Sequence, residues 1–351
     1  MGKISVGIIG SVGLPARYGG FETLVNNLSY QLRDTFNLHI SAEKKLESKK
    51  NTLPIGLKLY YINIRANGWQ SVFHDLAAIL KVSQSTKNIL LLGVGICPFL
   101  FLLKPLLKLK VICHIDGIEW KRNKWNILSK AYLRFALWCA YRVCNHLVID
   151  NEQLLKVLPK PKNNYSIIKY GGHPDTTKAK STGNVGYFLT IARATPENNL
   201  ELIANAVIET RMQWKLVSNF KNNRYGEALK KKYSGYKNIE CINAIYDETK
   251  LHQIRSNCKA YIHGHSAGGT NPSLVEIMFY PKPVFCYNAT FNISTTFGMA
   301  KYFSNSSDLA GLLINVDGFS HSLEMLKKAQ TEYDWNKICA EYESLFYHIF
   351  K

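Results

Sequence analysis

Short apolar runs alternate with helical patterns along most of the chain. Such runs, bounded by glycine or polar residues, are typical of buried parallel strands. In the first half they predict strands over 3–10, 38–41, 57–62, 89–93, 111–115, 146–149 and 166–168. Helical patterns lie between them over 20–32, 72–82, 98–109 and 125–142. This alternation predicts an α/β domain built on a parallel sheet.

The alternation continues in the second half, which predicts another domain of the same class. Its expected strands cover 186–192, 215–217, 239–242, 260–262 and 284–286. The glycine, proline, serine and lysine content of 171–185 favours an interdomain linker. We therefore expect domains over 1–170 and 186–330, then a closing segment 331–351 with a helical pattern over 335–350. A chain of 351 residues with 46% hydrophobic residues can form two sizeable cores.

The segment 263–276 contains the most informative candidate chemistry. Its glycine-rich loop follows an expected strand, and Asn271 and Pro272 fit the cap and first position of a helix. A strand, a glycine loop and a capped helix together direct backbone N–H groups at an anion such as phosphate. Glu276, one turn into the helix, could accept hydrogen bonds from a ribose diol. The segment therefore predicts a nucleotide-sugar site, although a tight turn with a solvated glutamate would give the same pattern.

A second glycine-rich loop follows the first expected strand. Gly10 and Gly13 fit half of a dinucleotide fingerprint, but no third glycine occurs at the required spacing. Gly19 and Gly20 instead precede a helical pattern, so the backbone can approach a ligand closely there. Arg17 is placed to meet a diphosphate or a sugar.

Four ordered motifs resemble one group of bacterial GT-B glycosyltransferases. They are GLPARYGGFET at 13–23, DGIEWKRNKW at 116–125, PENN at 196–199 and the segment 264–276. The group is family-4-like and includes rhamnosyltransferases of capsule, O-antigen and cell-wall polysaccharide assembly. The resemblance implies two Rossmann-like domains facing across a cleft, with the donor held mainly by the second and the acceptor mainly by the first. It also implies retention of anomeric configuration without a bound metal, and a terminal helix that crosses back to the first domain.

The resemblance also suggests roles for residues of the donor site. Glu276 matches the ribose-binding carboxylate, and Arg193 matches the diphosphate-binding arginine. The chain departs from the family at Gly268, where an acid is expected, and at Asn198, where a lysine is expected. His265, Asn271 or backbone amides could replace the missing acid. The expected donor-binding residues are Gly19, Gly20, Arg17, Arg193, His265, Gly268, Gly269, Thr270, Asn271, Ser273 and Glu276.

In the first domain, polar residues gather just after an expected strand end, where ligand sites of α/β domains form. Asp116 could orient the acceptor hydroxyl or take its proton, or it could be a structural cap. His114 could assist catalysis or only satisfy buried backbone groups. With Arg193, these two residues are the expected catalytic set. Contact with the acceptor or a membrane is expected from Glu119, Trp120, Lys121, Arg122 and Lys124.

The net charge of +19 indicates an anionic partner. Residues 99–142 hold nine lysines and arginines against Asp116 and Glu119, interleaved with aromatic residues. This pattern favours a surface that lies on an anionic bilayer. Three alternatives remain. The run 89–103 could span a membrane, although Gly93, Gly95 and Pro98 interrupt it. The basic residues could bind nucleic acid, although no such motif is present, or they could lie on ordinary solvated faces while the aromatic residues lie in the core.

Metal and compartment signals are weak. The eight cysteines form no C-x-x-C pair and show no zinc spacing, and His263 with His265 alone is poor evidence for a metal. The first strand begins directly after Met1-Gly2, without a signal-peptide pattern, and reduced thiols fit a cytoplasm. We expect no metal and no cofactor, since the nucleotide sugar is a substrate.

Together these patterns predict a cytoplasmic, peripherally membrane-associated glycosyltransferase. The expected partners are a nucleotide-diphosphate sugar, a glycan acceptor on polyprenyl diphosphate and the inner face of the cell membrane, with no nucleic acid. The resemblance favours L-rhamnose from dTDP-L-rhamnose. A UDP-hexose or UDP-N-acetylhexosamine donor is the alternative within the class. A nucleotide-sugar epimerase and a non-catalytic basic binding protein are alternatives outside it.

Overall fold

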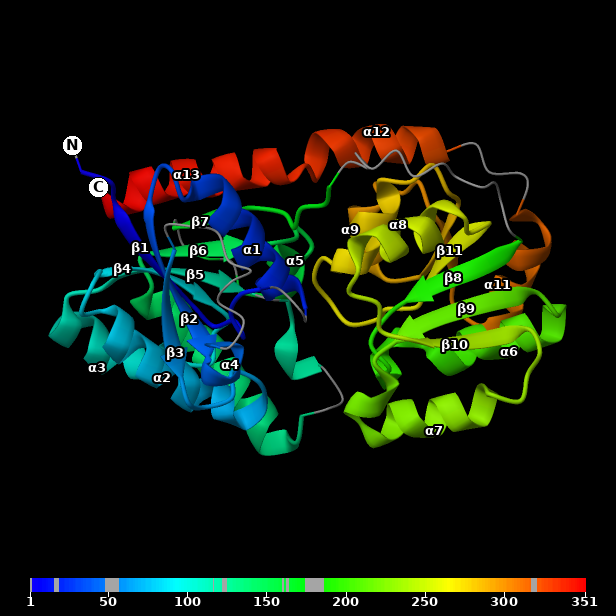
Figure 1. Ribbon diagram of the computed structural model, residues 1–351, viewed down its shortest axis with the longest axis horizontal. Helices are drawn as coiled ribbons and strands as arrows, with labels where there is room; N and C mark the ends of the chain where they lie inside the picture. Colours follow the sequence, from blue (N-terminus) through cyan, green and yellow to red (C-terminus); the bar gives the residue numbers. More distant parts are fainter. Residues whose placement is uncertain are drawn as a thin grey trace. The chain divides into compact units, whose positions relative to one another are not determined.

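The computed structural model describes residues 2–15, 19–47, 57–115, 117–121, 125–159, 161, 164–173, 186–316 and 321–351. The chain divides into two compact units (Figure 1). Unit 1 comprises Met1–Tyr170 with Trp335–Lys351, and unit 2 comprises Gly171–Asp334. Most of the expected linker, residues 174–185, lies outside the described residues.

Unit 1 is built on a seven-stranded sheet in which every neighbouring pair of strands is parallel. Its strand order is β3-β2-β1-β4-β5-β6-β7. The strands are β1 (Ser5–Ile9), β2 (Asn37–Glu43), β3 (Lys58–Ile62), β4 (Asn88–Leu92), β5 (Lys110–Ile115), β6 (His146–Ile149) and β7 (Tyr165–Ile167). The helices are α1 (Gly20–Leu32), α2 (Ser71–Val82), α3 (Cys97–Leu107), α4 (Ile127–Val143), α5 (Leu154–Val157) and α13 (Trp335–Phe350), with short 3-10 turns η2 (Gly68–Gln70) and η3 (Glu119–Lys121).

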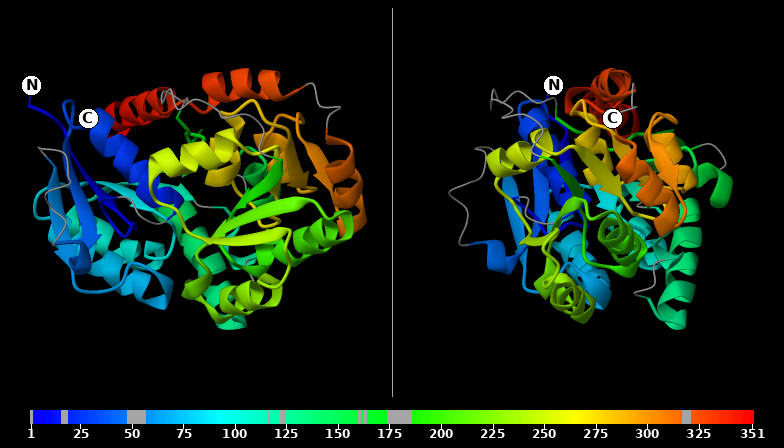
Figure 2. Two further views of the ribbon diagram at one scale, coloured as in Figure 1. Left: turned by 45° about the vertical axis from the view of Figure 1, so that its right-hand side comes forward. Right: turned by 90° about the vertical axis from the view of Figure 1, so that its right-hand side faces the viewer.

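The helices of unit 1 cover both faces of its sheet. Right-handed crossovers place α1 on one face, because it leads from β1 to β2, and α2, α3 and α4 on the other, because they lead in the opposite direction along the sheet. The terminal helix α13 packs beside α1, as Figures 1 and 2 both show. Phe346 of α13 meets Phe36 edge to face at 5.5 Å, which anchors the helix by apolar contact.

Unit 2 contains a six-stranded parallel sheet of order β10-β9-β8-β11-β12-β13. Its strands are β8 (Tyr187–Ile191), β9 (Gln213–Ser218), β10 (Ile239–Asn243), β11 (Ala260–His263), β12 (Val284–Tyr287) and β13 (Lys301–Phe303). Its helices are α6 (Leu200–Thr210), α7 (Arg224–Tyr233), α8 (Glu248–Ser256), α9 (Pro272–Met278), α10 (Thr290–Thr295), α11 (Ser306–Ile314) and α12 (Ser322–Glu332), with turns η4 (Pro196–Asn198) and η5 (Phe220–Asn222).

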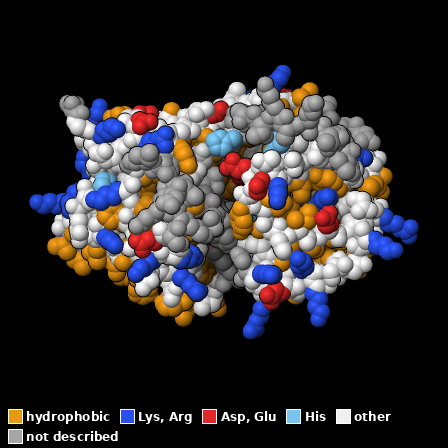
Figure 3. Space-filling model, viewed as in Figure 1, with side chains coloured by type: hydrophobic (Ala, Val, Ile, Leu, Met, Phe, Trp, Pro, Cys, Tyr) orange, Lys and Arg blue, Asp and Glu red, His pale blue; other side chains and the backbone are white. Residues whose placement is uncertain are grey.

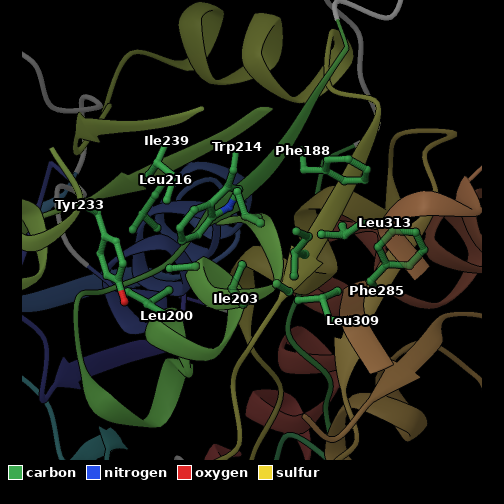
Figure 4. Close-up of a cluster of buried hydrophobic side chains, with 14 of the residues drawn as sticks. Phe188, Leu200, Ile203, Trp214, Leu216, Tyr233, Ile239, Phe285, Leu309 and Leu313 are labelled. Carbon is green, nitrogen blue, oxygen red and sulfur yellow. The ribbon is translucent and has the colours of Figure 1, made fainter. Parts of the chain in front are cut away.

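The core of unit 2 lies between this sheet and the helices α6 and α11 (Figure 4). Its large side chains include Trp214, Phe188 and Phe285, all almost completely buried. The indole N–H of Trp214 donates to Thr190 Oγ1 at 3.0 Å, so the one polar atom of that ring is satisfied inside the core. A well-packed core of this kind gives the loops at the strand ends a rigid support.

Both sheets have the strand order of a doubly wound Rossmann fold. Numbered by appearance, each runs three-two-one-four-five-six, with a seventh strand added in unit 1. In such sheets the chain reverses direction between the first and fourth strands, and ligands bind outside the carboxyl ends of the strands at that switch point. The predicted α/β class with two Rossmann-like domains is therefore confirmed.

The expected strands and helices all occur, with ends that differ by at most two residues. The pattern missed β13, because this edge strand has only three residues and begins with the exposed Lys301. The possible membrane span over 89–103 is wrong, since the run is divided between β4 and α3. Across the described part of the chain, no helix combines the length and apolarity needed to cross a bilayer.

The chain passes between the units at two points that are joined by backbone contact. The N–H of Gly172 donates to the carbonyl oxygen of Tyr333 at 2.6 Å, and Gly172 forms a parallel bridge with Asp334. On the unit 1 side, the rings of Tyr170 and Trp335 meet edge to face at 5.1 Å. The outgoing and returning segments are therefore neighbours.

Candidate functional site

The predicted donor residues of unit 2 leave two adjacent strands at the switch point. β8 and β11 pair directly, and the loops that follow them begin at 192 and 264. Arg193 lies in the first loop, while His265, Gly268, Gly269, Thr270 and Asn271 lie in the second, followed by Ser273 and Glu276 in α9. The fold therefore gathers these residues at one sheet edge, where the doubly wound topology favours a ligand.

The segment 196–199 braces the glycine-rich loop. Asn199 Nδ2 donates to Gly264 O at 2.8 Å, and the N–H of Ser266 donates to Glu197 O at 2.8 Å. At Gly264, a Cβ atom would lie 2.1 Å from Asn198 O, so only glycine fits. Two of the motifs that carry the family resemblance thus form one packed structure.

Asn198, which stands where the family has a lysine, positions His265. Its amide nitrogen donates to Arg193 O at 2.8 Å and to Thr195 Oγ1 at 3.0 Å. Its oxygen is therefore the atom that meets His265 Nδ1, at 2.8 Å, and that nitrogen of His265 carries the hydrogen. Because Asn198 is buried and neutral, it supplies no second cation for a diphosphate. It fixes the ring of His265 instead.

The departure at Gly268 has a steric cause. A Cβ atom there would fall 2.6 Å from the ring of Phe291, which begins α10 together with Thr290. The space that an acidic side chain would need is therefore filled by an aromatic ring. The following Asn292 donates from Nδ2 to His265 O at 2.8 Å, so α10 also braces the loop.

The start of α9 forms as the sequence predicts, but it offers few N–H groups to an anion. Asn271 Oδ1 accepts from the N–H of Ser273 at 3.1 Å, and Pro272 has no N–H. The N–H of Leu274 donates to Asn271 O at 3.0 Å. The role of this turn in binding an anion stays a prediction. In the loop before α9, Gly269 has a φ of 101°, which favours glycine.

Glu276 forms an ion pair that the sequence patterns did not suggest. Its Oε2 accepts from Nη2 of Arg255, a residue of α8. The Arg255 side chain is 11% exposed and that of Glu276 is 31% exposed. Burial alone would lower the pKa of Arg255, but the nearby carboxylate of Glu276 and the tyrosines Tyr280 and Tyr261 raise it. Arg255 therefore holds the carboxylate of Glu276 in place.

Arg193 and His263 differ sharply in their surroundings. Arg193 is exposed and forms no salt bridge with any carboxylate of the described residues. His263, at the end of β11, is buried, and its Nε2 has no hydrogen-bond partner in the described part of the chain. Burial lowers the pKa of His263 to about 3, so the ring is neutral.

One hollow of about 440 Å³ on unit 2 lies away from these residues. It is beside η5 and α7 and is lined by Phe220, Lys221, Glu227, Lys230, Lys231 and Ser234. None of them belongs to the predicted donor set. The strand-end geometry is the stronger guide to a ligand site, because this hollow is wide open and has no buried polar group directed into it.

The first glycine loop of unit 1 also follows the switch point of its sheet. At Gly10 a Cβ atom would fall 2.2 Å from Leu92 O of the neighbouring strand, so the backbones approach closely. The N–H of Val12 donates to Glu22 Oε1 at 2.9 Å, which ties the loop to α1. Gly19 caps α1 with a φ of 90°, and Gly20 is its first residue. Arg17 lies outside the described residues.

His114 lies near the end of β5 and is held by the terminal helix. Its Nδ1 is 2.7 Å from the hydroxyl of Tyr342 in α13, and its ring meets Phe21 of α1 edge to face at 5.3 Å. Both His114 and Tyr342 are buried. The sequence patterns did not suggest Tyr342, because it is far from His114 along the chain. Asp116, the other predicted catalytic residue of unit 1, lies outside the described residues.

The predicted acceptor and membrane residues are described only in part. Glu119 and Trp120 belong to η3 and are half-buried, while Arg122, Lys124 and the side chain of Lys121 fall among the residues that are not described. The nearby helices expose large apolar side chains, at 70% or more for Leu102, Leu106, Ile127 and Leu128. Phe99, Phe101, Phe135 and Trp138 are also exposed. Figure 3 shows hydrophobic side chains along the edge of unit 1 where Figure 1 places α2, α3 and α4.

Comparisons with known proteins support the fold and say little about the reaction. A family model described as a domain of unknown function (DUF1972) matches residues 3–173. No curated protein matches the chain significantly. Among solved structures, sucrose-phosphate synthase from Thermosynechococcus elongatus is similar with a TM-score of 0.80 at 11% identity, covering 99% of each chain. HepE of Anabaena in complex with UDP and glucose has a TM-score of 0.76 at 13% identity, covering 98% of this chain and 99% of that one.

A glycosyltransferase from Rickettsia africae is similar over the whole length of both chains, with a TM-score of 0.70 at 12% identity. At such identities the likeness establishes the fold, which is that of the GT-B glycosyltransferases.

Proposed function

We propose that this chain is a nucleotide-sugar-dependent glycosyltransferase. The observation that carries the proposal is the gathering of Arg193, the glycine loop and Glu276 at the switch point of the second sheet. That arrangement offers a cation and backbone amides for a diphosphate and a carboxylate for a ribose, as a nucleotide sugar requires. It is supported by the GT-B fold and by the UDP and glucose that HepE of Anabaena holds.

The proposed reaction retains the anomeric configuration. The acceptor hydroxyl oxygen forms a bond to the anomeric carbon of the donor sugar as the bond from that carbon to the phosphate oxygen breaks. The leaving phosphate oxygen takes the acceptor proton, so the products are a glycoside and a nucleoside diphosphate. The chain needs no nucleophile and, in this proposal, no metal or other cofactor. Arg193 and the loop amides stabilise the negative charge that develops on the diphosphate.

Two residues of unit 1 are proposed to serve the acceptor. Asp116 orients the acceptor hydroxyl, and His114 is held for the same task by Tyr342. His265, whose Nδ1 hydrogen is fixed by Asn198, presents its other ring edge to the donor sugar in place of the acid that Gly268 lacks. For Arg17, Gly19 and Gly20 of unit 1, the proposed role is contact with the donor, as the resemblance implies.

The donor is proposed to be dTDP-L-rhamnose, with growth of a lipid-linked oligosaccharide of a bacterial surface polysaccharide as the outcome. This choice follows from the resemblance of the four sequence motifs, and a UDP-hexose or UDP-N-acetylhexosamine is the alternative. A panel of dTDP- and UDP-sugars, assayed with a polyprenyl-diphosphate-linked acceptor and with liberated nucleotide as readout, tests it. Turnover of donor without acceptor would indicate an epimerase. Nucleotide binding without any turnover would indicate a non-catalytic binder.

Peripheral contact with the inner face of the cell membrane is the second part of the proposal. The exposed apolar side chains of α3 and α4 are flanked by Lys108, Arg134 and Arg142, and the Arg142 guanidinium lies 3.7 Å from the ring centre of Trp138. Each basic residue near an anionic surface contributes about 1 kcal/mol, and buried apolar side chains add to this. An anionic bilayer matches both the basic residues and the exposed apolar side chains, because it has a negatively charged surface and an apolar interior.

Vesicle sedimentation tests this surface. We expect binding to vesicles with anionic lipid, weaker binding at high salt, and loss of binding when Leu102, Ile127 and Leu128 are changed to serine. Leu323→Ser is the matched control, because Leu323 is 63% exposed and lies in α12 of unit 2. Equal binding of both variants would refute the proposed surface. Salt-sensitive binding to oligonucleotides instead of vesicles would indicate a nucleic-acid partner.

A further inference from the structure

Three cysteines that are far apart in the sequence meet inside unit 1. Cys97 is the first residue of α3, Cys113 lies in β5, and Cys144 follows the last residue of α4. Their sulfur atoms all lie within 4.8 Å of one another. Cys97 and Cys113 are fully buried and Cys144 is half-buried. No sequence motif indicated this cluster, because its members come from three different elements.

The spacing of the three sulfurs suits the binding of one cation by all three. A thiophilic cation sits about 2.3 Å from each thiolate sulfur, so three such ligands in a plane around it lie about 4 Å apart. The observed cluster therefore needs only a small contraction to enclose a cation. Because β5 and the ends of α3 and α4 fix the three backbones, the ligands are held in place before binding.

A cationic side chain and a backbone acceptor lie beside the cluster. Cys113 Sγ donates a hydrogen bond to Gly93 O at 3.5 Å. The Lys104 ammonium donates to Val143 O at 2.7 Å, immediately before Cys144.

We propose that Cys97, Cys113 and Cys144 form a binding site for a thiophilic d10 cation, Zn²⁺ or Cu⁺. Soft thiolate ligands select these ions, whereas calcium and magnesium require oxygen ligands. Zn²⁺ with three thiolates has a net charge of −1, which the Lys104 ammonium offsets. Zn²⁺ would take a fourth ligand from water on the half-buried side of Cys144, and Cu⁺ needs none.

Binding exchanges protons for the cation. Each thiol that becomes a ligand releases its proton to the solvent, no electron is transferred and no bond to carbon changes. Affinity therefore rises with pH while the thiols still titrate. The cluster belongs to unit 1, whereas the donor residues that follow β8 and β11 belong to unit 2. Cation binding can therefore be measured whether or not the protein transfers a sugar.

Metal titration of the full-length, reduced protein tests the proposal. Co²⁺ serves as the probe for Zn²⁺, because thiolate ligands give an intense sulfur-to-cobalt charge-transfer band, and Zn²⁺ should displace it. A second arm uses Cu⁺ in competition with a chromogenic chelator. We expect one equivalent of cation per chain, and an affinity at least about 100-fold lower for Cys113→Ser and Cys97→Ser. The cation that binds stoichiometrically at the lower free cation concentration is the one that the site selects.

Two controls distinguish a cation-binding site from three thiols that only pack together as apolar side chains. Cys286→Ser removes a fully buried thiol from unit 2 and should leave cation binding unchanged. Cys144→Ser alters the half-buried member, so it supplies a variant that folds if the buried substitutions do not. Circular dichroism of each variant checks the fold. Absence of stoichiometric binding by the folded parent protein, or a charge-transfer band that persists in Cys113→Ser and Cys144→Ser, would overturn the proposal.

Discussion

The ion pair between Arg255 and Glu276 predicts that the most direct test of the donor site also perturbs stability. Removing Glu276 leaves a guanidinium that is 11% exposed without its carboxylate. Breaking a buried pair in this way costs about 3–5 kcal/mol when both groups are fully buried. Because the Glu276 side chain is 31% exposed, we expect Glu276→Ala to cost roughly 2–3 kcal/mol. For a domain of this size that lowers the melting temperature by roughly 5–10 °C.

A double-mutant cycle measures the coupling directly. Glu276→Ala, Arg255→Met and the double variant are compared by urea unfolding followed by circular dichroism. We expect the double variant to be more stable than the sum of the single changes predicts, by roughly 1–3 kcal/mol, because an apolar residue replaces the uncompensated charge. Glu240→Ala is the matched control, since Glu240 pairs with Lys215 at 3.2 Å on the surface of the same unit and should cost less than about 1 kcal/mol.

The cycle would refute this reasoning if the two single changes were additive within about 0.5 kcal/mol. It also separates stability from function. Glu276→Gln keeps an amide oxygen that can accept from Arg255 but removes the charged acceptor for a ribose diol. Sugar transfer by Glu276→Gln should therefore fall, chiefly through weaker donor binding, in a protein that remains folded at the assay temperature. Unchanged kinetics would remove Glu276 from the donor site.

Three further predictions concern other parts of the structure. Gly264→Ala should destabilise the protein by about 3 kcal/mol or more in urea unfolding, because its Cβ would lie 2.1 Å from Asn198 O; a loss below 0.5 kcal/mol contradicts that contact. Tyr342→Phe should cost about 1–2 kcal/mol and change the pH profile of sugar transfer, because His114 Nδ1 loses its 2.7 Å partner; Tyr347→Phe on the same helix should do neither. Since the folded pKa of His263 (about 3) is below its unfolded value of 6.5, the unfolded chain gains the proton first, so stability is lost as pH falls from 6.5 towards 3. His263→Leu should flatten this part of the unfolding free energy measured against pH, and an unchanged slope would contradict a buried neutral ring.

The element pattern was predictable because each strand is an apolar run with a clear boundary. The run at 89–92 and the glycine at 93 indicated the passage from β4 towards α3, and the cap at Asn271 with Pro272 indicated the start of α9. Local signals of this kind depend only on neighbouring residues. The short edge strand β13 has too few residues to produce one.

Partners that come from distant parts of the chain were not predictable. Arg255 reaches Glu276 from a different helix, and Tyr342 reaches His114 from the end of the chain. Phe291 fills the space beside Gly268, although nothing in the loop sequence indicates which residue does so. The sulfurs of Cys97, Cys113 and Cys144 meet for the same reason. Each of these contacts follows from strand order and helix placement, which one sequence does not specify residue by residue.

Unit 2 is one continuous segment of the chain between the two sequence parts of unit 1, and its ends meet at Gly172 and Tyr333. Because Tyr170 already touches Trp335, a linker of a few residues could close unit 1 without unit 2. The two ends of unit 2 are also in contact, so unit 2 could be expressed as a separate protein or as a circular one. Ligand binding by each unit could then be measured in two separate polypeptides.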